Sequence, residues 1–483
     1  MHSCYPLLLS VALSISLTAQ TQLGDDILAD IAPGRTGIAL ALSQDGNRLL
    51  VADDFYSPGD AIQLGAIQLW EWNGTTWNKV GAPVVGESNF DKIGPTLAMN
   101  ADGTRFAYGI ASSGFDPGEV RVFELTAGEW QPLGAAFTGE SNERLGTDVS
   151  LSADGRLLAI GAAPSGFSPA QPMARVFEWT GSDWTLRGQP ITDPAPATST
   201  NFGAYTHLSA DGNRLLVADN LMTVTTTRLY TYDWTGTDWE QVGQPIAGQS
   251  DADEFGRTLA LSQDGNRMAV GAQGYDTDGA SNEGFVEVYD WTGIGWSRVG
   301  ATLYGDPDQW LGSGVALSDD GGLLVVGARG SINTDGQVSL YEVANDQLSL
   351  TTTIEETDGT FSGDGLGTAV ALSGSGGRVA VGEPDFFDDG LSSNSGRVRV
   401  FAVDDVATES VPILGVALYP NPTTACLSVS DGLSASWTVY DAYGRLLVRQ
   451  TGNHLSMVEL PAGVYTVRIE RLEGELLSRV VKR

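Results

Sequence analysis

Lysine, histidine and cysteine are scarce in this chain of 483 residues, and their scarcity excludes several functions. Only Lys79, Lys92 and Lys482 are lysines, and 26 basic residues face 60 acidic ones, for a net charge of −34. A chain this acidic does not bind nucleic acid or an anionic membrane surface by neutralising phosphates. We therefore expect neither of these partners.

The histidines are His2, His207 and His454, and the cysteines are Cys4 and Cys426. These residues are too few to assemble a His/Cys zinc cluster or a Cys–His dyad in the main body. A Ser-His-Asp triad would have to rest on His207 alone. We expect no cofactor, with calcium as the one candidate ion.

The N-terminus carries an uncharged apolar run, YPLLLSVALSISL, over residues 5–17. Its length fits the apolar region of a signal peptide and is too short to span a bilayer. No lysine or arginine precedes the run, which leaves a buried first strand or helix as the alternative. We predict a signal peptide over residues 1–20 and no transmembrane segment in the mature protein.

A turn motif, Leu/Met-Ser/Asn-x-Asp-Gly, recurs between two apolar runs along most of the chain, with a degraded last copy, LSGSG. The copies end at Gly46, Gly103, Gly155, Gly212, Gly265, Gly321 and Gly376. Their mean spacing of 55 residues suits a four-stranded unit plus loops and not a 34-residue helical repeat. The sequence therefore contains seven copies of one unit.

Each unit is predicted to be a four-stranded antiparallel meander. In the fifth unit, apolar residues alternate on both sides of the turn Asp264-Gly265, and further strands are expected over 285–291 and 296–299. A single meander leaves two edges unpaired and must stack or close. We predict an all-β, seven-bladed β-propeller over residues 21–405.

The seventh unit lacks a fourth strand, because its third strand over 397–401 runs directly into Asp404-Asp405. Near the N-terminus, residues 22–27 (QLGDDI) align with residues 241–246 (QVGQPI) of the fourth unit. We therefore predict that the N-terminal strand completes the last blade, so that the ring has no open edge.

An apolar-Gly pair precedes the first strand of the units, and a Gly-Ala or related pair ends the second strand, as in Gly271-Ala272. The pairs are Ile93-Gly94, Leu145-Gly146, Phe202-Gly203, Phe255-Gly256, Leu311-Gly312 and Leu366-Gly367. This pattern resembles the FG-GAP repeat of integrin-α-type seven-bladed propellers, over roughly residues 34–404. Calcium-binding members carry a D-x-D-x-D-G-x-x-D loop that is missing here, so the family's calcium sites do not carry over.

The composition changes near residue 413, and residues 413–483 carry a net charge of +1. After a linker over 406–415, turn residues separate short alternating strands, which predicts a small β-sandwich over 416–483. The segments YPNP (419–422), VYD (439–441), GR (444–445) and LPAGVY (460–465) precede a basic end. The tail is similar to the type A C-terminal sorting domain of the type IX secretion system of Bacteroidota; an adhesive β-sandwich is the alternative.

That resemblance implies export by the type IX secretion machinery, and so a secreted or outer-membrane surface-attached protein. The residues that carry the sorting signal by this resemblance are Tyr419, Pro420, Asn421, Pro422, Gly444, Gly463, Tyr465 and Lys482.

Two kinds of residue are candidates for a binding site. Most tryptophans recur at one place in the unit and are expected to pack, whereas Trp310 lies off that pattern and is a candidate for ligand contact. Three acidic loops offer carboxylates to a calcium ion, with solvated loops as the alternative. The calcium candidates are Asp251, Asp253, Asp276, Asp278, Asp385 and Asp388.

From these features we expect a monomeric, non-catalytic binding or adhesion module for an extracellular glycan or protein. A propeller hydrolase or lyase that uses loop carboxylates on a polysaccharide is one alternative, because such sites need only two carboxylates. A structural scaffold of the cell surface is the other.

Overall fold

The computed structural model divides into two compact units, Met1–Val403 and Asp404–Arg483. It describes residues 20–30, 33–111, 117–164, 171–194, 201–219, 226–251, 253–277, 281–331, 334–355, 363–387 and 394–403 of the first unit. In the second unit it describes residues 418–419, 426–429, 435–440, 446–452, 454–456, 460, 463–471 and 474–482. The predicted signal peptide, apart from Gln20, and the linker lie outside these ranges.

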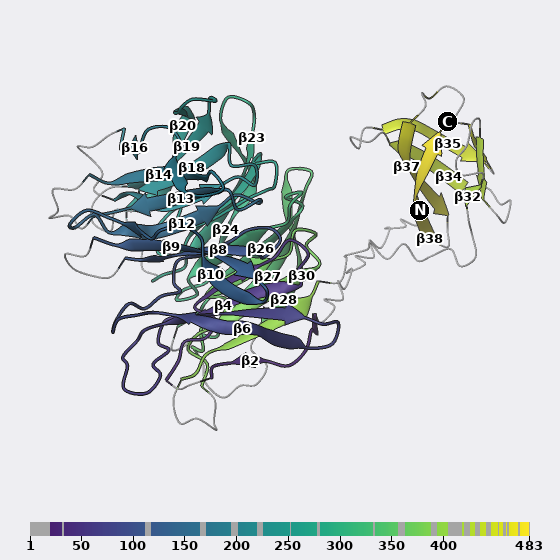
Figure 1. The fold of residues 1–483 in the computed structure, drawn as a ribbon. Helices are drawn as coiled ribbons and strands as arrows, with labels where there is room; N and C mark the ends of the chain where they lie inside the picture. The colour runs from purple at the N-terminus through teal and green to yellow at the C-terminus, as the bar shows by residue number, and fades with distance from the viewer. Residues whose placement is uncertain are drawn as a thin grey trace, which may run out of the picture. The chain divides into compact units, whose positions relative to one another are not determined.

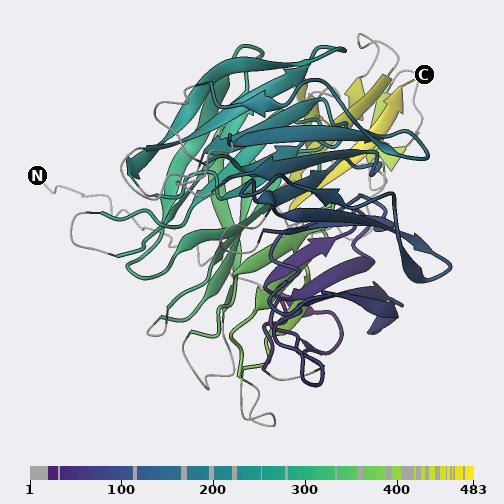
Figure 2. The same cartoon turned by 60° about the vertical axis from the view of Figure 1, so that its left-hand side comes forward.

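The first unit is a seven-bladed β-propeller, as predicted, and no helix occurs among the described residues (Figures 1 and 2). Blade 1 comprises β3 (Ala39–Leu42), β4 (Arg48–Asp53), β5 (Ala66–Trp72) and β6 (Trp77–Val85). Blade 2 comprises β7 (Leu97–Met99), β8 (Arg105–Ile110), β9 (Glu119–Thr126), β10 (Glu129–Pro132) and β11 (Phe137–Thr138). Blade 3 comprises β12 (Leu145–Leu151), β13 (Leu157–Ala162), β14 (Met173–Trp179), β15 (Trp184–Leu186) and β16 (Ile191–Thr192).

The remaining blades follow the same meander. Blade 4 comprises β17 (Phe202–Leu208), β18 (Arg214–Asp219), β19 (Thr226–Trp234) and β20 (Trp239–Asp251). Blade 5 comprises β21 (Thr258–Leu261), β22 (Arg267–Ala272), β23 (Phe285–Trp291) and β24 (Trp296–Tyr304). Blade 6 comprises β25 (Leu311–Leu317), β26 (Leu323–Ala328), β27 (Gln337–Ala344) and β28 (Gln347–Glu355). Blade 7 comprises β29 (Ala369–Leu372), β30 (Arg378–Glu383) and β31 (Arg397–Ala402), with β1 (Thr21–Gln22) and β2 (Ile27–Leu28).

The N-terminal strands close the ring in the predicted register. Gln22 pairs with Phe401 and Ile27 with Val398, just as Gln241 pairs with Tyr232 and Ile246 with Leu229 in blade 4. Ile27 is 3% exposed, so the closing strand also fills the core of its blade. The indole Nε1 of Trp77 in blade 1 donates to the carbonyl of Leu23 at 3.1 Å, which joins the closed blade to its neighbour.

Glycines allow neighbouring blades to approach closely at the apolar-Gly pairs. A Cβ added to Gly327 in β26 would lie 2.1 Å from the carbonyl oxygen of Gly367, which opens the next blade. The same contact joins Gly161 to Gly203, at 2.2 Å. The paired glycine motifs are therefore required by the packing between blades.

The Asp-Gly turns gather at one end of the propeller, here named the hairpin face. Each Asp caps its own turn, as predicted: Asp45 accepts from Ser43 Oγ at 2.6 Å and from the Asn47 amide at 2.9 Å. Burial opposes ionisation of Asp45, but these bonds outweigh it and leave its pKa below the ordinary value. Backbone bonds also cross between turns, as from Gln44 N to Ala101 O at 2.8 Å.

Arginines bind one blade to the next along the hairpin face. Arg214 forms an ion pair with Asp233 at 2.7 Å, donates to the carbonyl of Gly265 at 2.8 Å, and lies 4.4 Å from the ring centre of Trp291. Lysine, with a single compact ammonium, could not make these three contacts together, which explains why the basic residues are mostly arginine. The contact with Trp291 also confirms that the recurring tryptophans pack between blades.

The second unit is a small β-sandwich, as predicted. One sheet contains β32 (Leu418–Tyr419), β33 (Cys426–Val429) and β36 (His454–Ser456). The other contains β34 (Ala435–Tyr440), β35 (Leu446–Gly452), β37 (Gly463–Arg471) and β38 (Gly474–Lys482). Its core includes Trp437, which is fully buried and donates its indole hydrogen to the carbonyl of Gly452 at 2.8 Å.

Candidate binding site at the mouth of the channel

The loops that join one blade to the next place a single residue before each apolar-Gly pair, at the end of the propeller opposite the hairpin face. We name these positions the mouth residues: Arg35, Lys92, Arg144, Asn201, Glu254, Trp310 and Gly365. Four of them that carry a side chain adopt left-handed backbone angles, with φ of 50° at Lys92, 53° at Arg144, 57° at Glu254 and 56° at Trp310. With Gly365, at a φ of 78°, five of the seven mouth positions share this backbone conformation while the side chain varies from blade to blade.

In blades 1, 3, 5 and 6 the mouth residue contacts the residue that follows the second strand of its own blade, and in blades 1 and 5 this contact is polar and balanced. Arg35 forms an ion pair with Asp54 at 3.4 Å, and Glu254 accepts a hydrogen bond from Gln273 at 2.7 Å. Glu254 also pairs with Arg257 at 3.2 Å. The charges of blades 1 and 5 are thus compensated within the loops.

Blades 2 and 3 place a cation against an alanine instead. Among the residues that the structure describes, Lys92 and Arg144 form no ion pair. Lys92 Nζ lies 5.2 Å from the ring centre of Phe55, and Arg144 donates only a long bond, 3.4 Å, to the carbonyl of Ala163. The Nε atom of Arg144 is buried and has no hydrogen-bond partner in that part of the chain. Neither cation therefore has a carboxylate within ion-pair distance in that part of the chain, although Lys92 still interacts electrostatically with Asp54.

Lys92 and Arg144 line a cavity of about 870 Å³, here named the mouth cavity. Phe90 lies in the same lining, is 54% exposed and has a φ of 70°, which is strained for an aromatic residue. Tyr205 and Arg257 line both this cavity and the channel at the centre of the ring. The mouth cavity thus combines cations with an exposed aromatic side chain and opens towards the channel.

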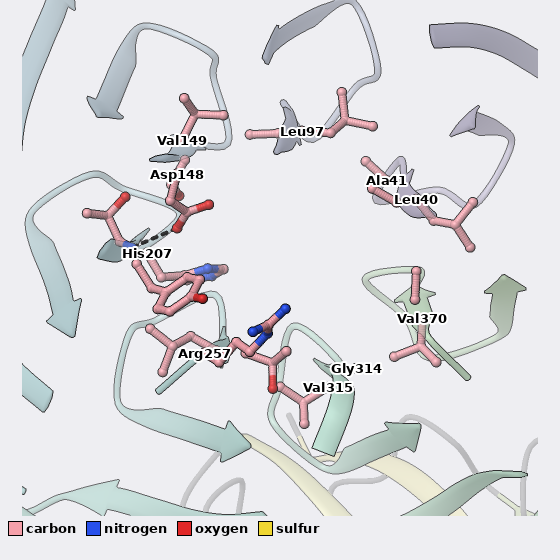
Figure 3. Close-up of a pocket in the computed structure, with 18 of the residues that line it drawn as sticks. Leu40, Ala41, Leu97, Asp148, Val149, His207, Arg257, Gly314, Val315 and Val370 are labelled. Carbon is pink, nitrogen blue, oxygen red and sulfur yellow. Dashed lines mark hydrogen bonds between the residues drawn. The ribbon is translucent and has the colours of Figure 1, made fainter. Parts of the chain in front are cut away.

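The channel has a volume of about 460 Å³ and is lined by the first strands of all seven blades. Asp148, His207 and Arg257 reach into it from blades 3, 4 and 5 (Figure 3). Burial raises the pKa of Asp148 to about 7, although the backbone amide of Thr206 donates to its carboxylate at 2.7 Å. Burial also lowers the pKa of His207 to about 4, so its imidazole is neutral at physiological pH.

Trp310, predicted as a ligand contact, occupies a mouth position and so belongs to the repeat after all. Its indole is partly buried under the guanidinium of Arg329, which lies 4.2 Å from the ring centre. The Nε of Arg329 is buried and has no partner among the described residues, and burial lowers the pKa of this arginine. A role for Trp310 in binding stays a prediction.

The candidate calcium ligands are placed apart. Asp253 is fully buried, and its carboxylate accepts from Thr227 Oγ1 at 2.8 Å and from the amides of Gln249, Ser250 and Phe255. Asp276 accepts from the amide of Asn282, and Asp385 lies 3.6 Å from Arg35. Asp251 ends β20, while Asp278 and Asp388 lie outside the described residues. In the described ranges no three His, Cys, Asp or Glu residues are grouped as a metal site.

The residues that sequence reasoning missed are Phe90, Lys92, Arg144 and Asp148, and it considered His207 only as a triad member. One signal was available for three of them: Phe90, Lys92 and Asp148 each differ from the residues at the same position in the other repeats, whereas Arg144 shares its residue type with Arg35.

A comparison with protein families settles the nature of the tail. Residues 417–483 match the secretion system C-terminal sorting domain. The chain therefore carries a sorting domain. The protein is exported, and it is either released or displayed at the cell surface. Of the sorting residues, Tyr419 lies in β32, Gly463 and Tyr465 in β37 and Lys482 in β38, where it pairs with Gly463. Pro420, Asn421, Pro422 and Gly444 lie outside the described residues.

The propeller resembles solved structures only in fold. A hydrazine synthase of Kuenenia stuttgartiensis is 15% identical, with a TM-score of 0.49, over 76% of this chain and 96% of that one. A periplasmic gluconolactonase of Pseudomonas aeruginosa is 16% identical, with a TM-score of 0.47, over 90% and 99%. No curated protein matches the chain. Within the described residues, no helix is long and apolar enough to cross a membrane.

Proposed function

We propose that the protein is an extracellular, non-catalytic binding module that holds an anionic glycan in the mouth cavity. The observation that carries this proposal is a pair of cations, Lys92 and Arg144, which line one cavity without an ion-pair partner in the described chain, in a protein with a net charge of −34. A cation that the protein itself leaves unpaired gains most from a carboxylate or sulfate supplied by a ligand.

The aromatic side chain of Phe90 favours a sugar over a simple anion. The ring is half exposed in the cavity lining, and the strained backbone beneath it is the kind of feature that clusters at ligand sites. Binding sites combine apolar surface with a few placed polar groups, and a charged sugar presents both kinds of surface. We also assign the repeats to the FG-GAP type, on their paired glycines.

Titration calorimetry tests the proposal with the purified full-length protein. We expect dextran sulfate or polygalacturonate to bind, neutral dextran not to bind, and the affinity to fall as salt is added. The double variant K92A/R144A should lose at least tenfold in affinity. The double variant K79A/R156A removes two charges away from the cavity and is the matched control. Equal losses in the two variants, or equal binding of neutral dextran, would contradict the proposal.

A hydrolase or lyase is the second candidate, and Asp148 is the residue that favours it. Its pKa near 7 suits proton transfer. The other carboxylate in the lining of the two cavities is Asp91, which accepts from the amides of Glu87 and Ser88 at 2.8 Å each. We expect no new reducing ends when the protein is incubated with either polymer. Their accumulation would replace the binding role with a catalytic one.

A further inference from the structure

The first strands of the blades line the channel, and two positions in them separate blades 3 and 4 from the rest. The second and fourth residues after the Gly of the apolar-Gly pair are small in five blades, being Ala39 and Ala41, Thr96 and Ala98, Thr258 and Ala260, Gly314 and Ala316, and Ala369 and Ala371. Blade 3 has Asp148 and Ser150 at these positions, and blade 4 has Tyr205 and His207. Because the other blades close with small residues, the fold does not require these four side chains.

Asp148 and Ser150 join the two blades to each other. The carboxylate of Asp148 accepts from the Thr206 amide at 2.7 Å, and Ser150 Oγ accepts from the Leu208 amide at 2.9 Å. The two bonds flank His207 in β17 and fix that strand against β12. Asp148 and Ser150 therefore act as positioning residues for the side chains that blade 4 presents to the channel.

His207 is not used in this junction. Its imidazole has no hydrogen-bond partner among the described residues, and it points into the channel (Figure 3). Because burial keeps the ring neutral, it offers one donor and one acceptor. Arg257 reaches into the same side of the channel from blade 5. Asp148, His207 and Arg257 thus come from three neighbouring blades and form one polar wall of the channel.

The opposite wall is apolar. Leu40, Ala41 and Val370 line it, across the channel from Asp148 and His207 in Figure 3. A channel with one polar and one apolar wall suits a sugar ring, whose edge carries hydroxyl groups and whose face carries C–H groups. An elongated hydrocarbon would leave the hydrogen-bonding groups of the polar wall without partners. An anion inside the channel would have to lie close to the carboxyl group of Asp148.

We propose that the wall formed by Tyr205 and His207 is a second subsite, inside the channel, for an uncharged terminal sugar ring of the glycan that the mouth cavity holds by its anionic group. This inference rests on the proposed function. Tyr205 lines both the mouth cavity and the channel, so the two subsites are continuous, and a two-sugar unit bridges them.

Two defined probes test the inference on the full-length protein: a sulfated monosaccharide, and the disaccharide in which a neutral sugar extends it. We expect the disaccharide to bind the wild-type protein at least tenfold more tightly. The variant Y205T/H207A installs the residues that other blades carry, so the fold should tolerate it. It should abolish the tenfold gain, whereas K92A/R144A should weaken both probes. The single variant H207A changes a residue that lines the channel alone, so it should reduce the gain and leave the monosaccharide affinity unchanged.

The outcomes separate the two claims. A wild-type protein that binds both probes equally overturns the second subsite and leaves the proposed function standing. A gain that survives in Y205T/H207A also overturns it. If neither probe binds, the proposed function fails and the inference fails with it. Should the double variant melt early, H207A alone is measured, and an undiminished gain in that variant counts against the inference.

Discussion

The two ends of the propeller are built from the same seven repeats but differ in how faithfully the repeats are kept. On the hairpin face, one Ser-Asp turn and one type of arginine bridge recur around the ring, as Asp45 and Arg214 illustrate. At the mouth, the backbone recurs but the side chain at each position changes, from Lys92 to Glu254 to Trp310. Repetition therefore marks the residues that hold the ring together, and departure from it marks the candidate site.

The contrast also concerns charge. Arg214 on the hairpin face has a carboxylate, a carbonyl and an indole as partners, while Arg144 and Arg329 at the mouth each keep a buried Nε without a partner in the described chain. Buried polar groups are almost always satisfied unless they have another use. The same residue type is thus a structural bridge at one end and an unsatisfied donor at the other.

Deleting residues 20–33 should have the largest effect, because it opens the ring and removes support from both ends at once. We expect a loss of unfolding free energy on the order of 5 kcal/mol, measured by urea denaturation. Ile27→Asp should reproduce much of the loss, since Ile27 is 3% exposed. Leu28→Asp is the control, since Leu28 is 38% exposed. An unchanged melting curve after the deletion would refute closure by the N-terminal strand.

Substituting an arginine at each end compares the two ends directly. Arg214→Ala removes an ion pair, a bond to Gly265 and the stacking on Trp291, so we expect a loss of about 2–4 kcal/mol. Arg329→Ala removes the stacking on Trp310 but also a desolvated charge whose buried Nε has no hydrogen-bond partner in the described chain, and should change stability by less than about 1 kcal/mol. Thermal and urea unfolding measure both, and equal losses would erase the distinction.

The pH dependence of stability should reveal the channel groups. Folded Asp148 keeps its proton up to about pH 7, whereas the unfolded chain releases it near 3.8, so this group's contribution to stability falls as the pH rises between those values. Folded His207 stays neutral down to about pH 4, while the unfolded chain gains a proton below 6.5, so its contribution falls as the pH falls. The two slopes oppose each other between pH 4 and 6.5.

Removing one of the two groups exposes the slope of the other. Relative to wild type, Asp148→Asn should lose stability as the pH falls from 6.5 to 4, on the order of 1 kcal/mol per pH unit. His207→Ala should show the reverse, losing stability as the pH rises from 4 to 6.5. Urea denaturation at a series of pH values measures both, and parallel curves for the three proteins would show that neither group is desolvated.

The smallest effect is expected at Phe90. Asn142 occupies the corresponding position of blade 3 with a φ of 66°, and asparagine tolerates this left-handed backbone better than phenylalanine. Phe90→Asn should therefore stabilise the protein by about 0.5–1 kcal/mol and weaken dextran sulfate binding. Phe137→Asn, at a residue that packs on Phe177 at 4.6 Å, should only destabilise. A gain in stability with unchanged affinity would remove Phe90 from the site.

The sequence predicts the ring better than the mouth, for physical reasons. Turns such as Asp264-Gly265 and strand ends such as Gly271-Ala272 repeat because every blade makes the same turn and the same contacts with its neighbours. The period, the number of blades and the register of Gln22 therefore follow from an alignment of the repeats. Sorting motifs such as Tyr419 and Gly463 are likewise contiguous and recognisable.

The mouth depends on single residues in loops of different lengths, and no local pattern shows which loops meet. Trp310 was expected off the repeat because the tryptophans elsewhere end strands, yet it shares its backbone position with Lys92 and Arg144. The sequence makes Asp253 a candidate calcium ligand. In the fold this residue is buried, and backbone amides donate to its carboxylate where a cation would otherwise bind. Whether a carboxylate is buried depends on distant strands.

The pairing of Gln22 with Phe401 has a further consequence, for the order of events during synthesis. The closing strand is synthesised before all seven blades and its partner β31 is the last strand of the propeller in the sequence, so the ring cannot close until the whole propeller has been synthesised. Contacts this distant in sequence form slowly, and an unclosed ring exposes a sheet edge at blade 7. The chain therefore cannot reach its final form until its last blade has been synthesised.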